Sequence, residues 1–231
     1  MVSELVYSMQ AQAPFQIQWY ASRSGVYKTR VQYQFVREHF PPAPARVFDL
    51  AGGSGRFALP LLRDGYDVTV NDLNSANLGL LQERCGDLPV SLLPGDFLQV
   101  SVPGQFDCAL AIECLNFLPF EPALARVRDL LKPGGVFVFS QLNSGSWRFL
   151  GRRMLGRARA GEHVMKTREY CAACNKLGFD VLSMRGMMWT PFMVNSNSPL
   201  VPVFANLERV LGLSAIHSQS PWILIAIRRR K

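Results

Sequence analysis

The sequence has no long apolar run, no internal repeat and no low-complexity segment. None of its apolar stretches approaches the roughly 20 residues that a membrane-spanning helix needs. The longest late stretch, Trp222 to Ile227, has the length of a strand. The first residues, Met-Val-Ser-Glu, lack the basic and apolar regions of a signal peptide. We therefore expect a cytoplasmic protein that is at most peripheral to a membrane.

Histidine and cysteine are also scarce, with three histidines and five cysteines in 231 residues. An odd number of cysteines without regular spacing does not predict a disulfide framework. Cys171 and Cys174 form a C-x-x-C pair, but no second pair and no nearby histidine accompanies them. We interpret them as buried or half-buried thiols on a helix and expect no bound metal.

Positive charge exceeds negative charge, and the net charge of +8 lies in two segments. Residues 146–169 hold seven basic and two acidic side chains, and the last four residues, Arg228 to Lys231, are all basic. The rest of the chain is close to neutral, with fourteen basic and fifteen acidic residues. This pattern argues against a general nucleic-acid-binding surface, so we expect no nucleic-acid partner.

Strand-like apolar runs alternate with helical segments from residue 46 onward. A helix over Val26 to Phe40 precedes them and ends at Pro41 and Pro42. The predicted strands are Arg46–Leu50, Asp67–Asn71, Val90–Leu93, Phe106–Ile112, Gly135–Gln141, Asp180–Gly186 and Trp222–Arg228. The predicted helices between them are Arg56–Asp64, Ser75–Cys85, Pro122–Leu131 and Arg168–Leu177. This alternation predicts one α/β domain with a mostly parallel sheet and helices on both faces.

A glycine-rich turn follows the first predicted strand, in the order Asp49-Leu50-Ala51-Gly52-Gly53-Ser54-Gly55. Residues 53–58 also fit the dinucleotide fingerprint G-x-G-x-x-A. The carboxylate of Asp49 would repel a pyrophosphate but attract a ligand that carries an ammonium or a sulfonium. The turn therefore favours a positively charged nucleoside over a dinucleotide.

Acidic residues also end the next two predicted strands. Asp72 can accept hydrogen bonds from ribose hydroxyls, and Asp96 can accept one from the amine of adenine, with Phe97 against the ring. Carboxyl ends of parallel strands meet at one edge of a sheet. Three acidic residues around one glycine turn therefore predict a nucleoside site more specifically than any one of them alone.

At this point the chain resembles the class I S-adenosylmethionine-dependent methyltransferases. The resemblance covers about residues 45–185 and includes several motifs in the family's order. These are Phe48 to Gly55, Asn71 to Asn74, Gly95 to Phe97, Phe106 to Leu115, Leu130 to Phe139 and Gly178 to Val181. It implies a Rossmann-like seven-stranded sheet with the last strand antiparallel, and S-adenosyl-L-methionine as methyl donor.

The resemblance also implies which residues line the donor site: Tyr27, Asp49, Ala51, Gly53, Gly55, Asp72, Leu73, Asp96, Phe97, Ile112 and Glu113. Two departures from the family pattern stand out. Ala51 replaces the usual first glycine of the turn, and Asn116-Phe117 replaces a Glu-His pair that often follows the fourth strand. An acid–base role at 116–117 is therefore not expected.

The layout that we expect has a helical lid over residues 1–44, a donor-binding core over 45–142 and two insertions, 143–167 and 187–221, that cap the acceptor. His163, in the first insertion, is the candidate general base. Residues 147–158 read as a basic amphipathic helix, with arginines beside a stripe that begins at Trp147. The second insertion is rich in methionine and aromatic residues, which form adaptable apolar pockets.

We expect methyl transfer to a small apolar or amphipathic acceptor with an acidic or polar end, and O-methylation in preference to other transfers. One alternative is a peripheral membrane enzyme that contacts the bilayer through residues 147–159 and methylates a lipid, a quinone or a polyprenyl-linked molecule. RNA or protein methylation, a non-catalytic donor-binding protein and a dehydrogenase are further alternatives. The sequence does not indicate an oligomeric state.

Overall fold

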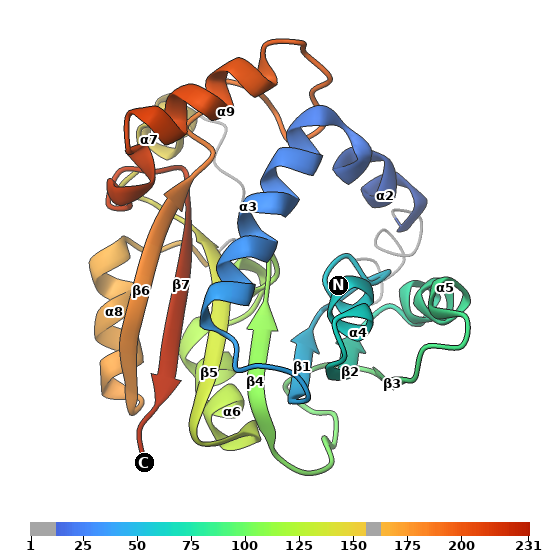
Figure 1. Cartoon of the computed structure of the whole chain (residues 1–231). Helices are drawn as coiled ribbons and strands as arrows, with labels where there is room; N and C mark the ends of the chain where they lie inside the picture. Colours follow the sequence, from blue (N-terminus) through green and yellow to red (C-terminus); the bar gives the residue numbers. More distant parts are fainter. Residues whose placement is uncertain (1–12, 156–162) are drawn as a thin grey trace.

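The computed structural model describes residues 13–155 and 163–231, which form a seven-stranded sheet between two layers of helices (Figure 1). The strand order is β3-β2-β1-β4-β5-β7-β6. β7 pairs antiparallel with both β5 and β6, whereas the other pairs are parallel. This architecture confirms the predicted Rossmann-like sheet with an antiparallel last strand.

The strands of the sheet are β1 (Arg46–Leu50), β2 (Asp67–Asp72), β3 (Val90–Pro94), β4 (Phe106–Ala111), β5 (Leu131–Leu142), β6 (Phe179–Met187) and β7 (Trp222–Arg229). The helices are α2 (Ala13–Ala21), α3 (Arg23–His39), α4 (Ala58–Arg63), α5 (Ser75–Cys85), α6 (Phe120–Leu130), α7 (Trp147–Met154), α8 (Thr167–Lys176) and α9 (Val201–Val210). Two short 3-10 helices, η1 (Leu115–Phe117) and η2 (Leu213–Ala215), complete the described elements.

Apolar side chains on the two faces of the sheet form two core clusters. One face packs against α3, α4 and α5, and its centre includes Val47, Val68 and Leu110. The other face packs against α6 and α8, and Phe137 and Phe139 lie at its centre with ring centroids 5.0 Å apart. Alternate residues of each strand thus point into opposite cores, as expected for a sheet covered on both faces.

The observed helix and strand ends differ from the predicted ones by a few residues. β5 begins at Leu131, before the predicted start at Gly135, because Leu131 pairs with Phe106 of β4. The predicted helix over Val26 to Phe40 is α3, which begins earlier because the Ser22 hydroxyl accepts a hydrogen bond from Gly25 N. α2 was not among the predicted helices.

The predicted basic helix over 147–158 is shorter in the structure. α7 ends at Met154 and Leu155 caps it, so residue 155 is no longer helical. Arg157, Ala158 and Arg159 lie outside the described residues. None of the described helices is both long enough and apolar enough to cross a bilayer.

The N-terminal helices and the second insertion lie side by side. α3 crosses the sheet over β5 and β7, and α9 packs against it (Figure 1). The Ser22 hydroxyl donates to the carbonyl of Val194 at 2.7 Å, and Ser24 N donates to the carbonyl of Ser196 at 3.0 Å. These bonds join the N-terminal helices to the segment between β6 and α9.

Candidate functional site

The glycine turn after β1 brings backbone groups close to two carboxylates. Gly52 N donates to the carbonyl of Asn71 at 3.1 Å, which fixes the turn against β2. A Cβ on Gly52 would lie 2.6 Å from Asp49 Oδ2, and Gly53 N donates to Asp72 Oδ2 at 2.9 Å. The predicted donor residues of the first two strands are therefore assembled at one point.

Three residues of this turn have positive φ angles, namely Ala51 (+53°), Gly53 (+59°) and Gly55 (+87°). Glycine adopts this conformation without a steric penalty, whereas an L-residue does so at a cost of roughly 1–2 kcal/mol. Ala51 stands at the position where the related motif has glycine, so it keeps the shape of the turn with local strain. Gly55 has no room for a side chain, because a Cβ would lie 2.3 Å from Leu81.

Asp49 presents a buried carboxylate with a free oxygen. Asp49 is only 2% exposed, and its Oδ2 has no hydrogen-bond partner among the described residues. Burial raises the pKa of Asp49 to about 8, although the positive charge of Arg56 opposes the shift. A buried carboxylate is stabilised by a hydrogen-bond donor or a cation, and the ammonium group of a ligand would supply one to Oδ2.

Asp72 is held by three hydrogen bonds. Besides Gly53 N it accepts from Asn74 N at 2.8 Å and from Asn77 Nδ2 at 3.3 Å. Burial raises the pKa of Asp72, and the three bonds oppose that shift. A carboxylate has about four acceptor positions, so one remains for a ligand. Leu73, the next residue, exposes 40% of its surface beside this site.

The third predicted strand end contributes less directly. Asp96 accepts from Leu98 N at 2.9 Å and from Gln99 Nε2 at 3.1 Å. The ring of Phe97 lies in the core, 5.9 Å from the ring of Phe48. Ile112 is buried at the end of β4. The contacts of these residues with adenine remain predictions.

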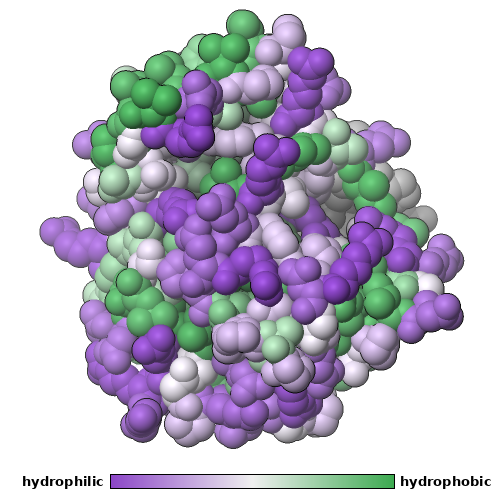
Figure 2. Space-filling model, in the orientation of Figure 1, coloured by the Kyte–Doolittle hydropathy of each residue, from purple (hydrophilic) through white to green (hydrophobic). Residues whose placement is uncertain are grey.

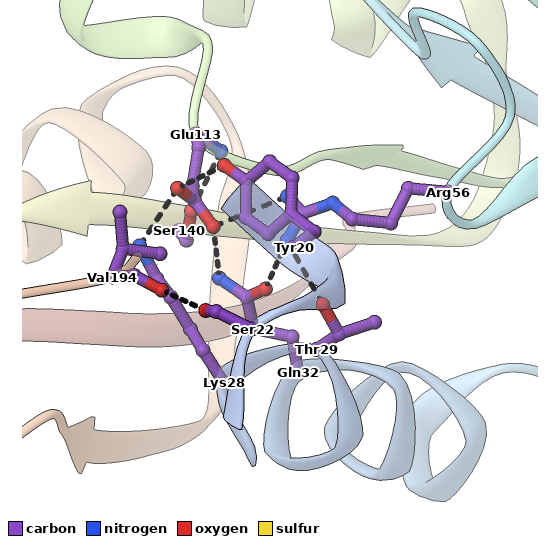
Figure 3. A network of polar contacts seen from close by, with 9 residues as sticks. All are labelled: Tyr20, Ser22, Lys28, Thr29, Gln32, Arg56, Glu113, Ser140 and Val194. Atoms are coloured by element: carbon purple, nitrogen blue, oxygen red, sulfur yellow. Dashed lines mark hydrogen bonds and ion pairs between the residues drawn. The ribbon is translucent and has the colours of Figure 1, made fainter. Parts of the chain in front are cut away.

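Glu113 is the centre of a polar network that joins the sheet to the N-terminal helices (Figure 3). Its carboxylate accepts from Lys28 Nζ at 2.7 Å, from Tyr20 Oη and Gln32 Nε2 at 2.8 Å, and from Arg56 Nη2 at 3.1 Å. The cations Lys28 and Arg56 hold the pKa of Glu113 well below its ordinary value, although burial alone would raise it.

The backbone of Glu113 is itself strained. Its φ is +66°, which is unusual for a residue other than glycine, and its N–H donates to Ser140 Oγ at 2.8 Å. Strain of this kind persists only where the surroundings fix it, and it is concentrated at functional sites. The network of Figure 3 provides that fixation through side chains of α2, α3 and the glycine turn.

Sequence reasoning missed Tyr20, Lys28, Gln32 and Arg56. A signal existed on α3, where Ser24, Lys28 and Gln32 recur at helical spacing and are all buried. Tyr27 lies next to Glu208 of α9, and burial, together with the negative charge of Glu208, raises the pKa of the phenol.

His163 lies apart from the glycine turn on a surface depression. Its backbone N donates to the carbonyl of Asn116 at 2.8 Å, which ties the first insertion to η1. The side chain is exposed, and the depression of about 430 Å³ is lined by Pro119, Phe120, Glu121, His163, Val164 and Met165. A role as general base remains a prediction.

The remaining sulfur and acid groups do not form a metal site. Within residues 13–155 and 163–231, no three histidine, cysteine, aspartate or glutamate side chains lie together as metal ligands would. Cys174 is buried, and burial raises the pKa of its thiol to about 12, while Cys171 is half-buried. The prediction of buried or half-buried thiols is confirmed.

A family model described as a methyltransferase domain matches residues 47–135. A ubiquinone biosynthesis O-methyltransferase of Paracidovorax citrulli is 30% identical over 161 residues, which cover 63% of this chain and 68% of that protein. A ubiquinone/menaquinone biosynthesis C-methyltransferase of Methylobacterium nodulans is 36% identical over 103 residues, 41% of each chain.

Solved structures share the whole fold. A protein from Thermotoga maritima, described as an S-adenosylmethionine-dependent methyltransferase and possible histamine N-methyltransferase, superposes with a TM-score of 0.68. Its sequence is 16% identical, and the match covers 97% of this chain and 99% of that one. The magnesium protoporphyrin IX methyltransferase of Synechocystis, with bound S-adenosylhomocysteine, has a TM-score of 0.64 at 14% identity and covers 93% of this chain and 87% of that one.

Proposed function

Because the chain belongs to the class I S-adenosylmethionine-dependent methyltransferases, we propose that it methylates an oxygen atom of a small amphipathic acceptor. Its activity is S-adenosylmethionine-dependent methyl transfer. The preference for oxygen draws support from relatives that are named ubiquinone biosynthesis O-methyltransferases. Those relatives extend beyond the matched region, since the match with the first of them spans about two thirds of its length.

The observation that carries the donor-binding part of the proposal is the unpartnered Oδ2 of buried Asp49 beside the glycine turn. S-adenosylmethionine, when bound, supplies a methyl group on a positively charged sulfur that is already a good leaving group. In our proposal Asp49 faces the ammonium group, Asp72 accepts from the ribose hydroxyls and Asp96 accepts from the adenine amine. Leu73 provides an apolar surface beside the nucleoside.

This chain contributes mainly orientation and exclusion of water. In-line displacement at the methyl carbon needs an aligned nucleophile. Alignment alone can lower the activation barrier by several kcal/mol, and by about 7–11 kcal/mol at most. The Glu113 network holds α2 and α3 over the carboxyl ends of the strands, which shields the reacting atoms from solvent. His163 is the proposed base where the acceptor hydroxyl must lose its proton early.

The two insertions, 143–167 and 187–221, form the proposed acceptor cap over the core of 45–142, with 1–44 as the lid. Met187 and Met188 are buried at the base of the second insertion. The rings of Phe192 and Phe204 meet edge to face with centroids 5.4 Å apart. Side chains of this kind favour an apolar or aromatic part of the acceptor.

A second candidate is an enzyme that takes a lipid, quinone or polyprenyl-linked acceptor from a membrane surface. α7 buries none of its residues, and Trp147, Leu150 and Met154 expose 49%, 50% and 88% of their surfaces. α9 exposes Val203, Leu207 and Val210, and hydrophobic surface gathers over that helix in Figure 2. Arg152 and Arg153 on α7 and Arg209 on α9 accompany these apolar residues, as in helices that lie on anionic bilayers.

Calorimetric titration with S-adenosylmethionine and S-adenosylhomocysteine tests the donor site. We expect micromolar binding that Asp72→Ala weakens at least about tenfold, equivalent to about 1.4 kcal/mol. Asp67→Ala is the matched control, because Asp67 lies at the other, exposed end of β2. Incubation with catechol and S-adenosylmethionine, followed by mass spectrometry, should then yield an O-methylated product. Folded protein that binds neither nucleoside would refute the proposal.

A further inference from the structure

A buried polar junction lies where α3, α7 and the segment after β6 meet, outside the glycine turn. Arg148 of α7 donates from Nη2 to the carbonyl of Thr190, in the segment after β6. Lys28 of α3 lies 4.0 Å above the ring of Trp222. Trp222 of β7 pairs with Met187 of β6, and Met187 lies three residues before Thr190 in the chain. The two contacts therefore place Lys28 and Arg148 close to each other, and the charge of Arg148 acts on Lys28.

The junction holds more positive than negative charge. Lys28 is only 3% exposed and pairs with Glu113, which Arg56 also shares. Burial lowers the pKa of the Lys28 ammonium, and the positive charges of Arg56 and Arg148 add to that effect against the opposing charge of Glu113. Among the described residues Arg148 has no carboxylate partner, and burial lowers the pKa of its guanidinium. Two of the three cations, Lys28 and Arg56, thus share the carboxylate of Glu113. The carboxyl group of Glu208 accepts from the backbone of Met188 and Trp189 nearby, and burial raises its pKa.

Buried polar atoms without partners lie on the same helix and the same segment as the contacts of these cations. Ser24 lies one helical turn before Lys28 on α3, is 0% exposed, and its Oγ has no hydrogen-bond partner in the described part of the chain. The Oγ1 of Thr190 and the Nε1 of Trp189 are likewise buried without partners among those residues. Buried hydroxyl and indole donors cost free energy unless something accepts from them.

From these donors and cations we infer a binding site for a carboxylate formed by Lys28, Arg148, Ser24 and Thr190. A carboxylate accepts up to about four hydrogen bonds and forms paired, charge-assisted bonds with an arginine fork. It would neutralise the excess cation and satisfy the unpartnered hydroxyls together. This inference rests on the proposed function, because the junction lies between the lid and the proposed acceptor cap.

Two carboxylates of the reaction have this chemistry: an acidic group on the acceptor and the methionine carboxylate of the donor. Arg148 is on the insertion after β5, which favours the acceptor. The two sources separate experimentally, because each has a neutral analogue that keeps the rest of the molecule.

The test compares acids with neutral analogues on wild type, Arg148→Gln and Arg148→Lys. Acceptor probes are 3,4-dihydroxybenzoate and caffeate, each against its amide, titrated with S-adenosylhomocysteine present. Donor probes are S-adenosylmethionine and its decarboxylated form. Arg168→Gln is the matched control, because this substitution removes the same charge from an exposed residue of α8. Thermal unfolding verifies that each variant is folded.

We expect the wild type to prefer one class of acid over its neutral analogue by at least about tenfold. Arg148→Gln should abolish that preference, Arg148→Lys should retain part of it, and Arg168→Gln should leave it unchanged. A preference among the acceptor probes assigns the site to the acceptor, and one among the donor probes assigns it to the donor.

The absence of any preference in wild type, or a preference that survives in folded Arg148→Gln, would overturn the inference. Binding of S-adenosylhomocysteine and methylation of neutral catechol report on the proposed function separately. They would persist if only the carboxylate site were wrong.

Discussion

The raised pKa of Asp49 predicts that binding of the donor at the proposed site releases a proton. With a pKa of about 8 in the free protein, its carboxyl group is largely protonated at neutral pH. Because this pKa is raised above its unfolded value, ionisation of Asp49 lowers the stability of the free protein as pH rises from about 4 to about 8. A bound cation favours the ionised form and therefore lowers the pKa again.

We expect about one proton to be released per S-adenosylmethionine bound near pH 7. The binding enthalpy measured in phosphate and in Tris should differ by the ionisation enthalpies of the buffers in proportion to that release. Asp49→Asn, which cannot release a proton, should show almost no buffer dependence. Proton uptake, or equal enthalpies for the wild type in both buffers, would contradict the assignment of Asp49 to the ammonium.

Single residues also show where sequence reasoning worked. Asp49, Gly53 and Asp72 were predicted to lie close together at the ends of neighbouring parallel strands. The structure joins Gly53 N to Asp72 by a bond of 2.9 Å, and the carboxylate of Asp49 lies against Gly52 of the same turn. Lys28 and Arg56 were missed. Their shared partner, Glu113, is more than 50 residues distant from either of them, and local periodicity carries no information about such a pairing.

At the scale of elements, the α2–α3 pair is fastened to the sheet through one carboxylate. Glu113 carries two buried or half-buried ion pairs and two further hydrogen bonds from these helices and the glycine turn. Because the pKa of Glu113 is depressed, its stabilising contribution is complete at neutral pH and is lost only on acidification. The N-terminal helices also bond to the segment between β6 and α9 through Ser22 and Ser24.

Glu113→Gln should lower the free energy of unfolding by about 3–5 kcal/mol, because Lys28 and Arg56 would lose their charge partner while buried. Urea denaturation measures the loss, and amide hydrogen exchange should show faster exchange in α3. Glu121→Gln is the control, since its ion pair with Lys176 is largely exposed and is worth about 1 kcal/mol or less. Equal effects of the two substitutions would show that Glu113 does not fasten the helices.

Elements with strong local signals were predicted well, and those that depend on distant partners were not. β1, β2 and α5 combine apolar periodicity with turn or capping residues, such as Asn74, whose side chain accepts from Ala76 N. β5 begins four residues before its predicted start, because its first residue pairs with β4. α2 has no comparable apolar periodicity, and its place depends on contact with α3.

For the whole molecule, strand order explains why the donor half could be inferred and the acceptor half could not. The order β3-β2-β1-β4 brings the three acidic strand ends to one edge, and that order follows from right-handed crossovers between parallel strands. The cap instead depends on how α7, α9 and the segment after β6 pack on one another. Trp147, Met154 and Val210 are exposed in this region. Periodicity alone does not distinguish whether such apolar residues lie in the core or on the surface.

That exposed surface predicts association with anionic bilayers. The segment 187–221 contains one acidic residue, Glu208, which is buried, so no exposed carboxylate of that segment opposes the arginines. An arginine near an anionic bilayer contributes about 1 kcal/mol, or about fivefold in affinity. The apolar residues of α7 and α9 would add burial in the interfacial region.

Co-sedimentation should therefore show binding to vesicles of phosphatidylcholine with about 30% phosphatidylglycerol, weaker binding to phosphatidylcholine alone, and a decrease as salt rises. Arg153→Gln and Arg209→Gln should each weaken binding about fivefold, and Met154→Gln should weaken it by removing buried apolar area. Arg63→Gln, on α4 and exposed, should have little effect. Equal binding to neutral and anionic vesicles would exclude the electrostatic contribution. If the protein binds neither kind of vesicle, the membrane candidate is excluded, because an acceptor embedded in a membrane requires the enzyme to contact the bilayer. The acceptor would then be a small molecule that reaches the protein from solution.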